Sequence, residues 1–406
     1  MPELLEEIPD LTGHRRRTLA VLSAGQVLSG ISFGATVSLG AVLAATISGD
    51  DALSGLATAA ITLGTATFSM PLAAMAGRRG RGPALASGMA VALIGVGLVI
   101  GAVAVRSFPM LLIGFALVGA GQSANLQARF AATDLATDAS RGRDLSLVVW
   151  STTLGAVLGP NLVGPGETLG QLVGMPDLTG PYLFTIVGQL AGTALYWFGL
   201  RPDPLLLAQR IAIRDAVTGT SVERADRPVA ARYAMLAVVG AHTVMVSVMA
   251  MTPIHLLHHG ATLTIVGLTI SLHIAGMYAL SPVFGLLADR WGRLRTIALG
   301  YTTLAASAAV IALGASDPRW VTVALILLGL GWSAATVSGA ALLTEASAPS
   351  LRVRRQGRND AAMSLLGAIG AIAAGGALGW FGFAGLALCT LPLIVAVVVL
   401  APLGRR

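Results

Sequence analysis

The sequence contains no lysine, only one cysteine and few charged side chains. All 26 basic residues are arginine, and charged residues make up 11% of the 406 residues, against about 25% in soluble globular proteins. The single cysteine excludes a framework of disulfide bonds and a zinc site made of cysteines. With 55% hydrophobic residues and a mean hydropathy of +0.79, the composition predicts an all-α protein with many membrane-spanning helices.

The sequence also lacks the signals of two other classes of protein. The net charge of +7 does not indicate nucleic-acid binding, because the arginines occur in short loops between apolar runs. No nucleophile–base set, phosphate loop or His-Glu-x-x-His motif is present. We therefore expect neither an enzyme nor a bound cofactor. We expect the chain to be surrounded by the lipid bilayer and not to bind nucleic acid.

Twelve apolar runs are long enough to cross a bilayer, which takes about 20 helical residues. They lie at 18–47, 52–76, 84–105, 109–133, 145–165, 180–200, 232–256, 264–288, 296–315, 319–343, 359–379 and 383–403. The predicted architecture is two pseudo-symmetric six-helix bundles, at 1–200 and 232–406, joined by a hydrophilic linker at 201–231.

Arginine is confined almost entirely to one side of this twelve-span arrangement. The loops on that side carry the arginine clusters at 15–17, 78–81, 141–143, 290–295 and 352–358. The opposite side has only Arg106 and Arg319 as cations. Because arginine-rich loops stay in the cytoplasm, we expect both termini and the linker on the cytoplasmic side.

The two predicted bundles repeat one another in their arginine-rich loops. The segment Gly77-Arg78-Arg79-Gly80-Arg81 corresponds to Asp289-Arg290-Trp291-Gly292-Arg293, and Asp134 corresponds to Glu345. Parallel repeats are typical of transporters whose substrate site lies between the halves, near the middle of the membrane. We predict that these acids and arginines close a cytoplasmic gate. The alternative interpretation is that the arginines only set the topology.

The segment from Gly285 to Arg293 resembles the loop signature of the major facilitator superfamily. It matches the pattern G-x-L-A-D-R-x-G-R at every specified position. The resemblance implies the fold of that superfamily and transport of a small solute. It also implies that Gly285 and Gly292 allow close helix contact, while Asp289 caps a helix and pairs with arginine to latch the gate. We expect a monomer in the cytoplasmic membrane of a bacterium.

The first-half copy departs from this signature, because Gly77 stands where the aspartate would be. In the first half, Asp134 is therefore predicted to pair with Arg78 or Arg81.

Histidine and methionine are crowded into one stretch of the second half. Five of the six histidines fall between His242 and His273, and five of the twelve methionines fall between 235 and 277. Met245 and Met249 are one helical turn apart and share a face, which also carries His242. His273 and Met277 form a second pair of this kind, at similar predicted depths in the membrane.

Thioether sulfur and neutral imidazole favour monovalent copper, whereas hard cations need oxygen ligands. We therefore predict Met245, Met249, His273 and Met277 as ligands of a transported copper ion. The alternative is that the methionines only fill space between helices. The two pairs resemble those of the CcoA-type copper importers within the same superfamily, over the seventh and eighth predicted helices. This resemblance implies copper import.

Two further patterns keep a second hypothesis open. Gln122, Asn125 and Arg129 form a polar stripe on the fourth predicted helix, either lining a substrate cavity or, for Arg129, pairing with Asp134. The fifth helix carries Gly155-x-x-x-Gly159-Pro160, which resembles the antiporter signature of the superfamily but also suits plain helix packing. The second hypothesis is proton-coupled efflux of lipophilic drugs or other small organic molecules.

Overall fold

The computed structural model describes residues 11–50, 53, 55–217 and 225–405, and within them the chain forms helices and no strand. Nine stretches of these residues are long and apolar enough to cross a membrane. One of them, Pro349–Val399, holds the last two of the twelve predicted spans, and the other eight hold one each. Two more helices, α1 (Leu11–Ser48) and α5 (Arg141–Asn161), stand at the remaining two spans. The predicted all-helical membrane architecture is confirmed.

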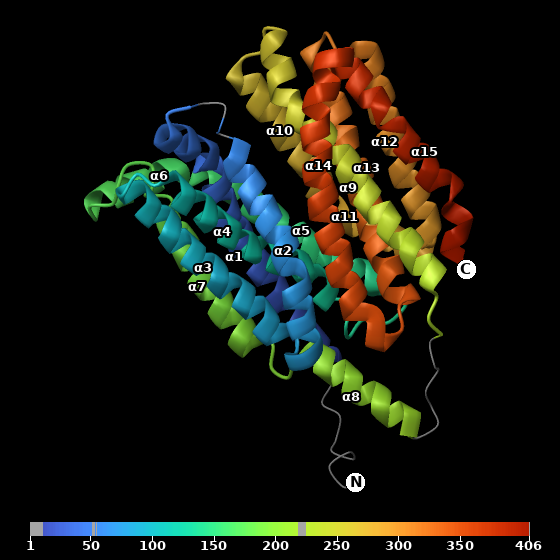
Figure 1. Ribbon diagram of the computed structural model, residues 1–406. Coiled ribbons are helices and arrows are strands. Elements are labelled where there is room, and N and C mark those ends of the chain that lie inside the picture. The colour runs from blue at the N-terminus through green and yellow to red at the C-terminus, as the bar shows by residue number, and fades with distance from the viewer. Residues whose placement is uncertain (1–10, 51–52, 54, 218–224, 406) are drawn as a thin grey trace. The chain divides into compact units, whose positions relative to one another are not determined.

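The other helices follow in chain order and are labelled in Figure 1. They are α2 (Gly55–Arg79), α3 (Arg81–Ala104), α4 (Phe108–Ala131), α6 (Val163–Leu172), α7 (Tyr182–Gly199), α8 (Pro204–Val217), α9 (Pro228–His258), α10 (Leu263–Tyr278), α11 (Ser281–Arg290), α12 (Arg293–Gly314), α13 (Pro318–Ala346), α14 (Pro349–Cys389), α15 (Leu391–Val399) and a 3₁₀ turn, η3 (Ala401–Arg405).

Several helices begin before the predicted spans, at prolines that lie within the arginine-rich segments. Pro228 and Pro349 are the first residues of α9 and α14, a position where the missing N–H of proline costs nothing. Pro204 likewise begins α8, so the predicted linker contains a helix. Pro282 interrupts the predicted span 264–288, which is divided into α10 and α11.

The helices form two compact units. Unit 1 consists of Met1–Asp138, Leu154–Asp226 and Ser347–Asp360, and unit 2 consists of Ala139–Thr153, Arg227–Ala346 and Ala361–Arg406. The beginning of α5 therefore belongs to unit 2, while the first turns of α14 belong to unit 1.

In unit 1, α4 is the central helix and packs against α1, α2 and α3. The core at one end of the unit is apolar and includes Leu43, Val99, Leu111 and Phe115, each at most 1% exposed. A second, smaller cluster joins α2 and α3 to α8 and to the first turns of α14 through Leu205 and Val353.

In unit 2, α13 is the central helix and packs against α9, α10, α11 and α12 (Figure 1). All its residues from Gly331 to Thr344 are buried. The backbones of α10 and α13 approach closely at Gly329, where a Cβ atom would collide with the carbonyl oxygen of His273. Two helices that carry the predicted metal ligands, α9 and α10, thus share α13 as a neighbour.

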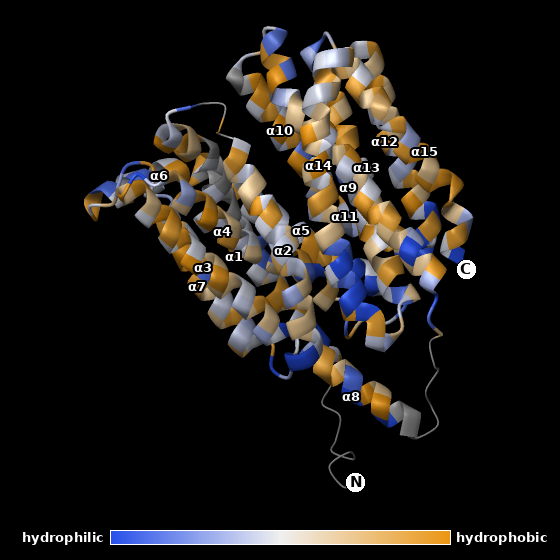
Figure 2. Cartoon of the chain, in the orientation of Figure 1, coloured by the Kyte–Doolittle hydropathy of each residue, from blue (hydrophilic) through white to orange (hydrophobic). Residues whose placement is uncertain are grey.

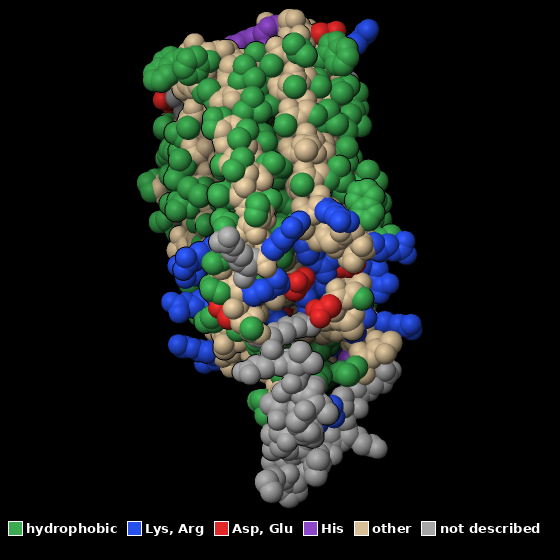
Figure 3. Space-filling view, turned by 90° about the vertical axis from the view of Figure 1, so that its right-hand side faces the viewer, with side chains coloured by type: hydrophobic (Ala, Val, Ile, Leu, Met, Phe, Trp, Pro, Cys, Tyr) green, Lys and Arg blue, Asp and Glu red, His purple; other side chains and the backbone are tan. Residues whose placement is uncertain are grey.

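Side-chain polarity follows the helix ends. Figure 2 shows hydrophobic residues along the middle of most helices and hydrophilic residues around the arginine-bearing turns of α14. On the face seen in Figure 3, hydrophobic side chains form a broad band, with arginines gathered below it and histidine at its upper edge. This pattern is expected of a protein whose helices face lipid in the middle and water at their ends.

Candidate functional site

The first repeated loop forms a buried ion pair. Gly80 precedes α3 with a φ of 95°, a conformation that glycine adopts without strain. The next residue, Arg81, is 1% exposed and donates from Nε and Nη2 to the two carboxylate oxygens of Asp134, at 2.8 and 3.1 Å. Its Nη2 also donates to Oε1 of Gln356 on α14, at 2.7 Å. Of the two predicted partners of Asp134, the structure pairs it with Arg81, while Arg78 is exposed.

The second repeated loop forms the equivalent pair in unit 2. Gly292 precedes α12 with a φ of 100°, and Arg293 is again the first residue of the helix and buried. The guanidinium of Arg293 pairs with Asp289, and its Nε lies 3.5 Å from Oε2 of Glu345. Glu345 also accepts a hydrogen bond from Nη2 of Arg227, at 2.9 Å. The remaining predicted gate residue of this loop, Arg290, is exposed.

Asp289 has a second function that Asp134 does not share. Its two carboxylate oxygens accept hydrogen bonds from the backbone N–H groups of Gly142 and Arg143, both at 2.9 Å. These amides belong to the first turn of α5, where helix N–H groups have no partner in their own helix. A carboxylate is stabilised there by the helix dipole as well. Asp289 on α11 therefore caps the beginning of α5.

Close backbone contact makes this cap possible. A Cβ atom on Gly142 would lie 2.6 Å from the carbonyl oxygen of Gly285, so a larger residue would separate α5 from α11. Ser281, at the beginning of α11, adds a hydrogen bond to the carbonyl oxygen of Ser146, at 3.1 Å.

The structure explains why the first half has Gly77 instead of an aspartate. The segment Arg141-Gly142-Arg143 corresponds in the repeat to Gln356-Gly357-Arg358, so the counterpart of Gly142 is Gly357, which packs against Ala73 of α2. However, α14 begins at Pro349, so the N–H of Gly357 lies inside the helix. Amides inside a helix bond to carbonyls one turn earlier and need no cap.

The polar stripe on α4 contacts two other helices of unit 1. Asn125 and Gln26 of α1 bond to each other through their amides, and Nε2 of Gln26 also donates to the carbonyl oxygen of Asn125, at 2.9 Å. Arg129 is 3% exposed and donates from Nη2 to Oδ1 of Asp360 on α14, at 2.6 Å. Gln122 is partly buried. The partner of Arg129 is thus Asp360, not Asp134, which is bound by Arg81.

Asp360 was not among the predicted site residues. The available signal was its position as the second residue of the predicted span 359–379, since a carboxylate in a membrane helix needs a partner.

His273 is fully buried and oriented by a single hydrogen bond. Its Nδ1 lies 2.8 Å from the carbonyl oxygen of Leu325 on α13. A carbonyl only accepts, so Nδ1 carries the proton and Nε2 of the neutral ring has the lone pair. Nε2 is buried and has no hydrogen-bond partner among the described residues. A metal-binding histidine is commonly held in this way, with its other nitrogen bonded to a backbone carbonyl.

The other predicted ligands lie on α9 and α10. Met245 and Met249 are on α9 with His242, and Met277 is on α10 with His273. Met245 is 5% exposed and Met277 is 7% exposed, while Met249 is partly buried. His242 accepts a hydrogen bond at Nδ1 from Nε1 of Trp332, at 3.3 Å. The Trp332 ring also meets Tyr278 edge-on, with ring centroids 5.8 Å apart. Trp332, which sequence reasoning missed, therefore connects α9 and α10 through α13.

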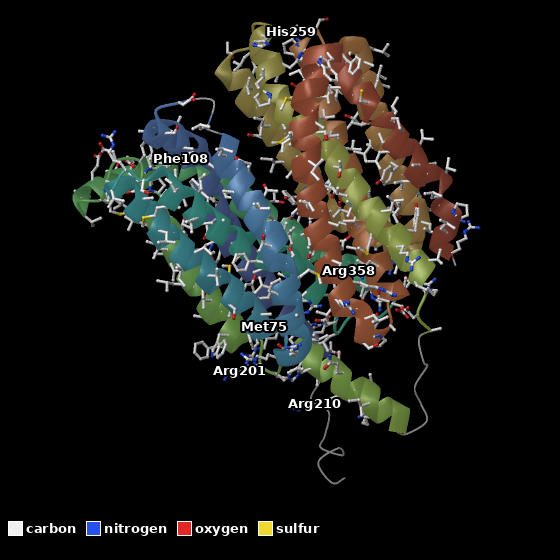
Figure 4. The ribbon with its side chains drawn as sticks, in the orientation of Figure 1. Met75, Phe108, Arg201, Arg210, His259 and Arg358 are labelled. Atoms are coloured by element: carbon white, nitrogen blue, oxygen red, sulfur yellow. The ribbon has the colours of Figure 1, made fainter. Side chains whose placement is uncertain are left out.

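A separate cavity lies at the end of α9, where Figure 4 labels His259. It measures about 690 Å³ and is lined by His255, His258, His259 and turns of α12 and α14. Nε2 of His255 is bonded to the carbonyl oxygen of Ala315, at 2.6 Å. Within the described part of the chain, no group of three or more histidine, cysteine or acidic side chains is arranged to hold a metal. Metal binding would therefore depend on methionine sulfur.

The linker is held to α14 by a second capping aspartate. Asp226 accepts from the N–H of Ala348, at 3.0 Å, and from Nη2 of Arg355, at 2.8 Å. The hydrogen bond from Arg355, followed by that from Ala348, holds the pKa of the Asp226 carboxyl below its usual value.

We expect the Asp226–Arg355 pair to stabilise the protein at neutral pH and not in acid. A lowered folded-state pKa contributes stability above the unfolded pKa, about 3.9, and this contribution is lost as the pH falls through the folded value. Arg355→Gln should therefore lower the thermal unfolding midpoint at pH 7, with a difference that disappears toward strongly acidic pH. Arg354→Gln, at an exposed neighbouring position, is the matched control. A pH-independent effect of Arg355→Gln would contradict this origin.

Comparison with known proteins identifies the fold and then the family. Solved structures with the same helical arrangement include the human organic anion transporter MFSD10 (TETRAN), with a TM-score of 0.75, 16% identity and coverage of 95% of this chain and 99% of that one. The proton:xylose symporter XylE also matches, with a TM-score of 0.75, 14% identity and coverage of 96% and 95%. These proteins share the fold of two six-helix bundles.

The chain belongs to the major facilitator superfamily, whose family model matches residues 22–261 and 234–406. The uncharacterized MFS-type transporter YddS of Bacillus subtilis is 36% identical over 365 residues, which cover 87% of this chain and 83% of the relative. The riboflavin transporter RfnT of Brucella anthropi is 30% identical over 354 residues, which cover 86% and 85%. The chain is thus a multi-pass membrane transporter rather than an enzyme.

Proposed function

We propose that this chain moves a small solute across the bacterial cytoplasmic membrane by alternating access, as a monomer with both termini in the cytoplasm. Two pairs at corresponding positions support this proposal: Arg81 with Asp134, and Arg293 with Glu345. Each joins the first residue of a helix to the end of another membrane segment. Ion pairs of this kind can form in one conformation and break in another. The gate consists of these pairs and the Asp289 cap.

For the substrate we propose monovalent copper, moved inward. The observation that carries this proposal is the ring of His273, which presents a buried Nε2 lone pair without a partner among the described residues. A buried polar atom without a partner is costly, and binding of a metal would remove that cost. Met277 lies one turn further along the same helix and is also buried, so soft ligands share one face of α10.

A second candidate is a small organic solute. It is favoured by the identity of 30% to the riboflavin transporter RfnT and by the amide pair of Gln26 and Asn125 in unit 1. Paired amides can exchange their mutual hydrogen bonds for bonds to a polar solute. We retain riboflavin as the probe for this candidate.

The two candidates are separated by transport into liposomes that contain the purified chain. We expect radiolabelled copper, kept monovalent with ascorbate, to enter these liposomes several-fold faster than protein-free liposomes. Riboflavin is expected to enter both at the same rate. Riboflavin uptake without copper uptake would replace the copper proposal with the organic-solute proposal. If neither probe moves although a thermal unfolding measurement shows that the purified protein is folded, both substrate proposals are wrong.

A further inference from the structure

Two buried aspartate–arginine pairs among the described residues of unit 1 differ in how completely the carboxylate is satisfied. Both oxygens of Asp134 receive an N–H of Arg81, in the two-point geometry typical of a stable ion pair. Asp360 is 0% exposed, and both of its donors, Nη2 of Arg129 and Nδ2 of Asn359, reach the same oxygen, Oδ1, at 2.6 and 3.3 Å. Its Oδ2 is buried and has no hydrogen-bond partner within the described residues.

An ionised carboxylate in this position is expensive. Burial removes its hydration, and one guanidinium contact does not fully replace it. Protonation at Oδ2 would remove the negative charge, and the side chain of Asn359 could serve both states. Its amide donates to Oδ1 now, and the same hydrogen bond can persist when the proton is bound at Oδ2. Asn359 Oδ1 is itself buried without a partner among the described residues.

Few other titratable groups among the described residues near Asp360 could bind this proton instead. Arg129 on α4 and Arg81 at the beginning of α3 are the cations that act on it. Asp134 is bound by Arg81, and α2 has no titratable side chain between Gly55 and Gly77. On the linker side, Asp226 is bound by Arg355. Figure 4 labels Arg358 on this part of α14, and its side chain is exposed.

We propose that Asp360 is a proton-binding site of the transporter, and that protonation releases Arg129 and thereby loosens the first turns of α14 from α4. The pair is a direct ionic link between these two helices, so its charge state sets how firmly they are held. This inference builds on the proposed transport function, because it assigns a coupling ion to it. Proton uptake from one side and release to the other would then accompany each transport cycle.

Infrared spectroscopy of the purified protein tests proton binding without any substrate. As the pH is lowered, we expect the wild type to gain a carboxylic-acid C=O band that is absent from Asp360→Asn. Asp134→Asn, which alters the other buried pair, is the matched control and should retain the band. If Asp360→Asn does not fold, the double variant Asp360→Asn/Arg129→Gln removes both charges together and is used instead. A band that persists in the variant lacking the Asp360 carboxyl would overturn the proposal.

Transport measurements then connect the proton to the solute, with monovalent copper as the probe. For one proton per ion, a difference of about one pH unit across the membrane should change the steady-state copper ratio about tenfold. Asp360→Asn should lose this response while keeping exchange of copper for copper at equal pH. If copper does not move at all, the copper proposal fails, whereas the infrared result still decides proton binding. If copper moves and Asp360→Asn keeps the pH response, only the proton-site proposal fails.

Discussion

Asp289→Ala is expected to slow transport by roughly ten- to a hundredfold while leaving the protein folded. The substitution removes two hydrogen bonds from the backbone of α5, at Gly142 and Arg143, and the ion pair with Arg293. A hydrogen bond to a charged group contributes about 1.5–3 kcal/mol. Since about 1.4 kcal/mol is a factor of ten in an equilibrium, a net loss equivalent to one such bond in one conformation gives this range.

The effect should appear in turnover more than in stability, because the cap joins α5 to α11 only in conformations that bring them together. Asp317→Ala is the matched control. Asp317 also caps a helix, by accepting from the N–H of Arg319, but it does so within its own segment. Turnover is measured in liposomes, and folding is measured by thermal unfolding in detergent. Wild-type turnover in Asp289→Ala, or an equal loss in Asp317→Ala, would show that the cap does not act as a gate.

Much of the architecture could be predicted from the sequence because membrane spans have a simple physical signature. A run of about 20 apolar residues is costly in water and has few alternatives to a helix in lipid. The ends of the helices were harder to predict from the sequence, because the apolar run ends at the first arginine whereas the helical hydrogen bonds continue beyond it. The segment before the predicted span 359–379 illustrates this, since α14 already begins at Pro349.

Partners across the chain could not be predicted, because a pattern gives the type of a side chain but not its neighbour. Arg129 is only five residues from Asp134 in the sequence, yet Arg81 bonds to both oxygens of that carboxylate. Arg129 instead bonds to Asp360, which is 231 residues away. The loop signature did indicate that Asp289 and Arg293 act together, and these two residues, four apart in the sequence, form an ion pair across the turn between α11 and α12.

The sequence also gave no information on how His273 is oriented. Its spacing from Met277 indicated a shared face, but the bond to Leu325 that fixes the tautomer comes from packing at Gly329. Only a glycine at that position allows α10 to lie close enough to α13 for this hydrogen bond. The gate and metal-ligand assignments stay predictions, now with specific atoms to test.

Removal of the His273 imidazole is expected to weaken copper binding at least about a hundredfold and to abolish copper uptake. Loss of a residue that merely orients a metal ligand costs roughly ten- to a hundredfold in affinity, so loss of the ligand itself should cost no less. Binding of monovalent copper to His273→Ala is measured by equilibrium dialysis with metal analysis. Uptake is measured in liposomes.

Two comparisons separate ligation from packing. Met277→Leu and Met249→Leu keep an apolar side chain of similar size but remove the sulfur, so a packing function predicts little change and a ligand function predicts loss of copper binding. Met251→Leu on α9 and His258→Ala at an exposed position are matched controls outside the proposed ligand set. If both leucine variants bind and transport copper like the wild type, the methionines only pack. If His273→Ala does so as well, the buried Nε2 lone pair is not a copper ligand, and the organic-solute proposal becomes the better account of this transporter.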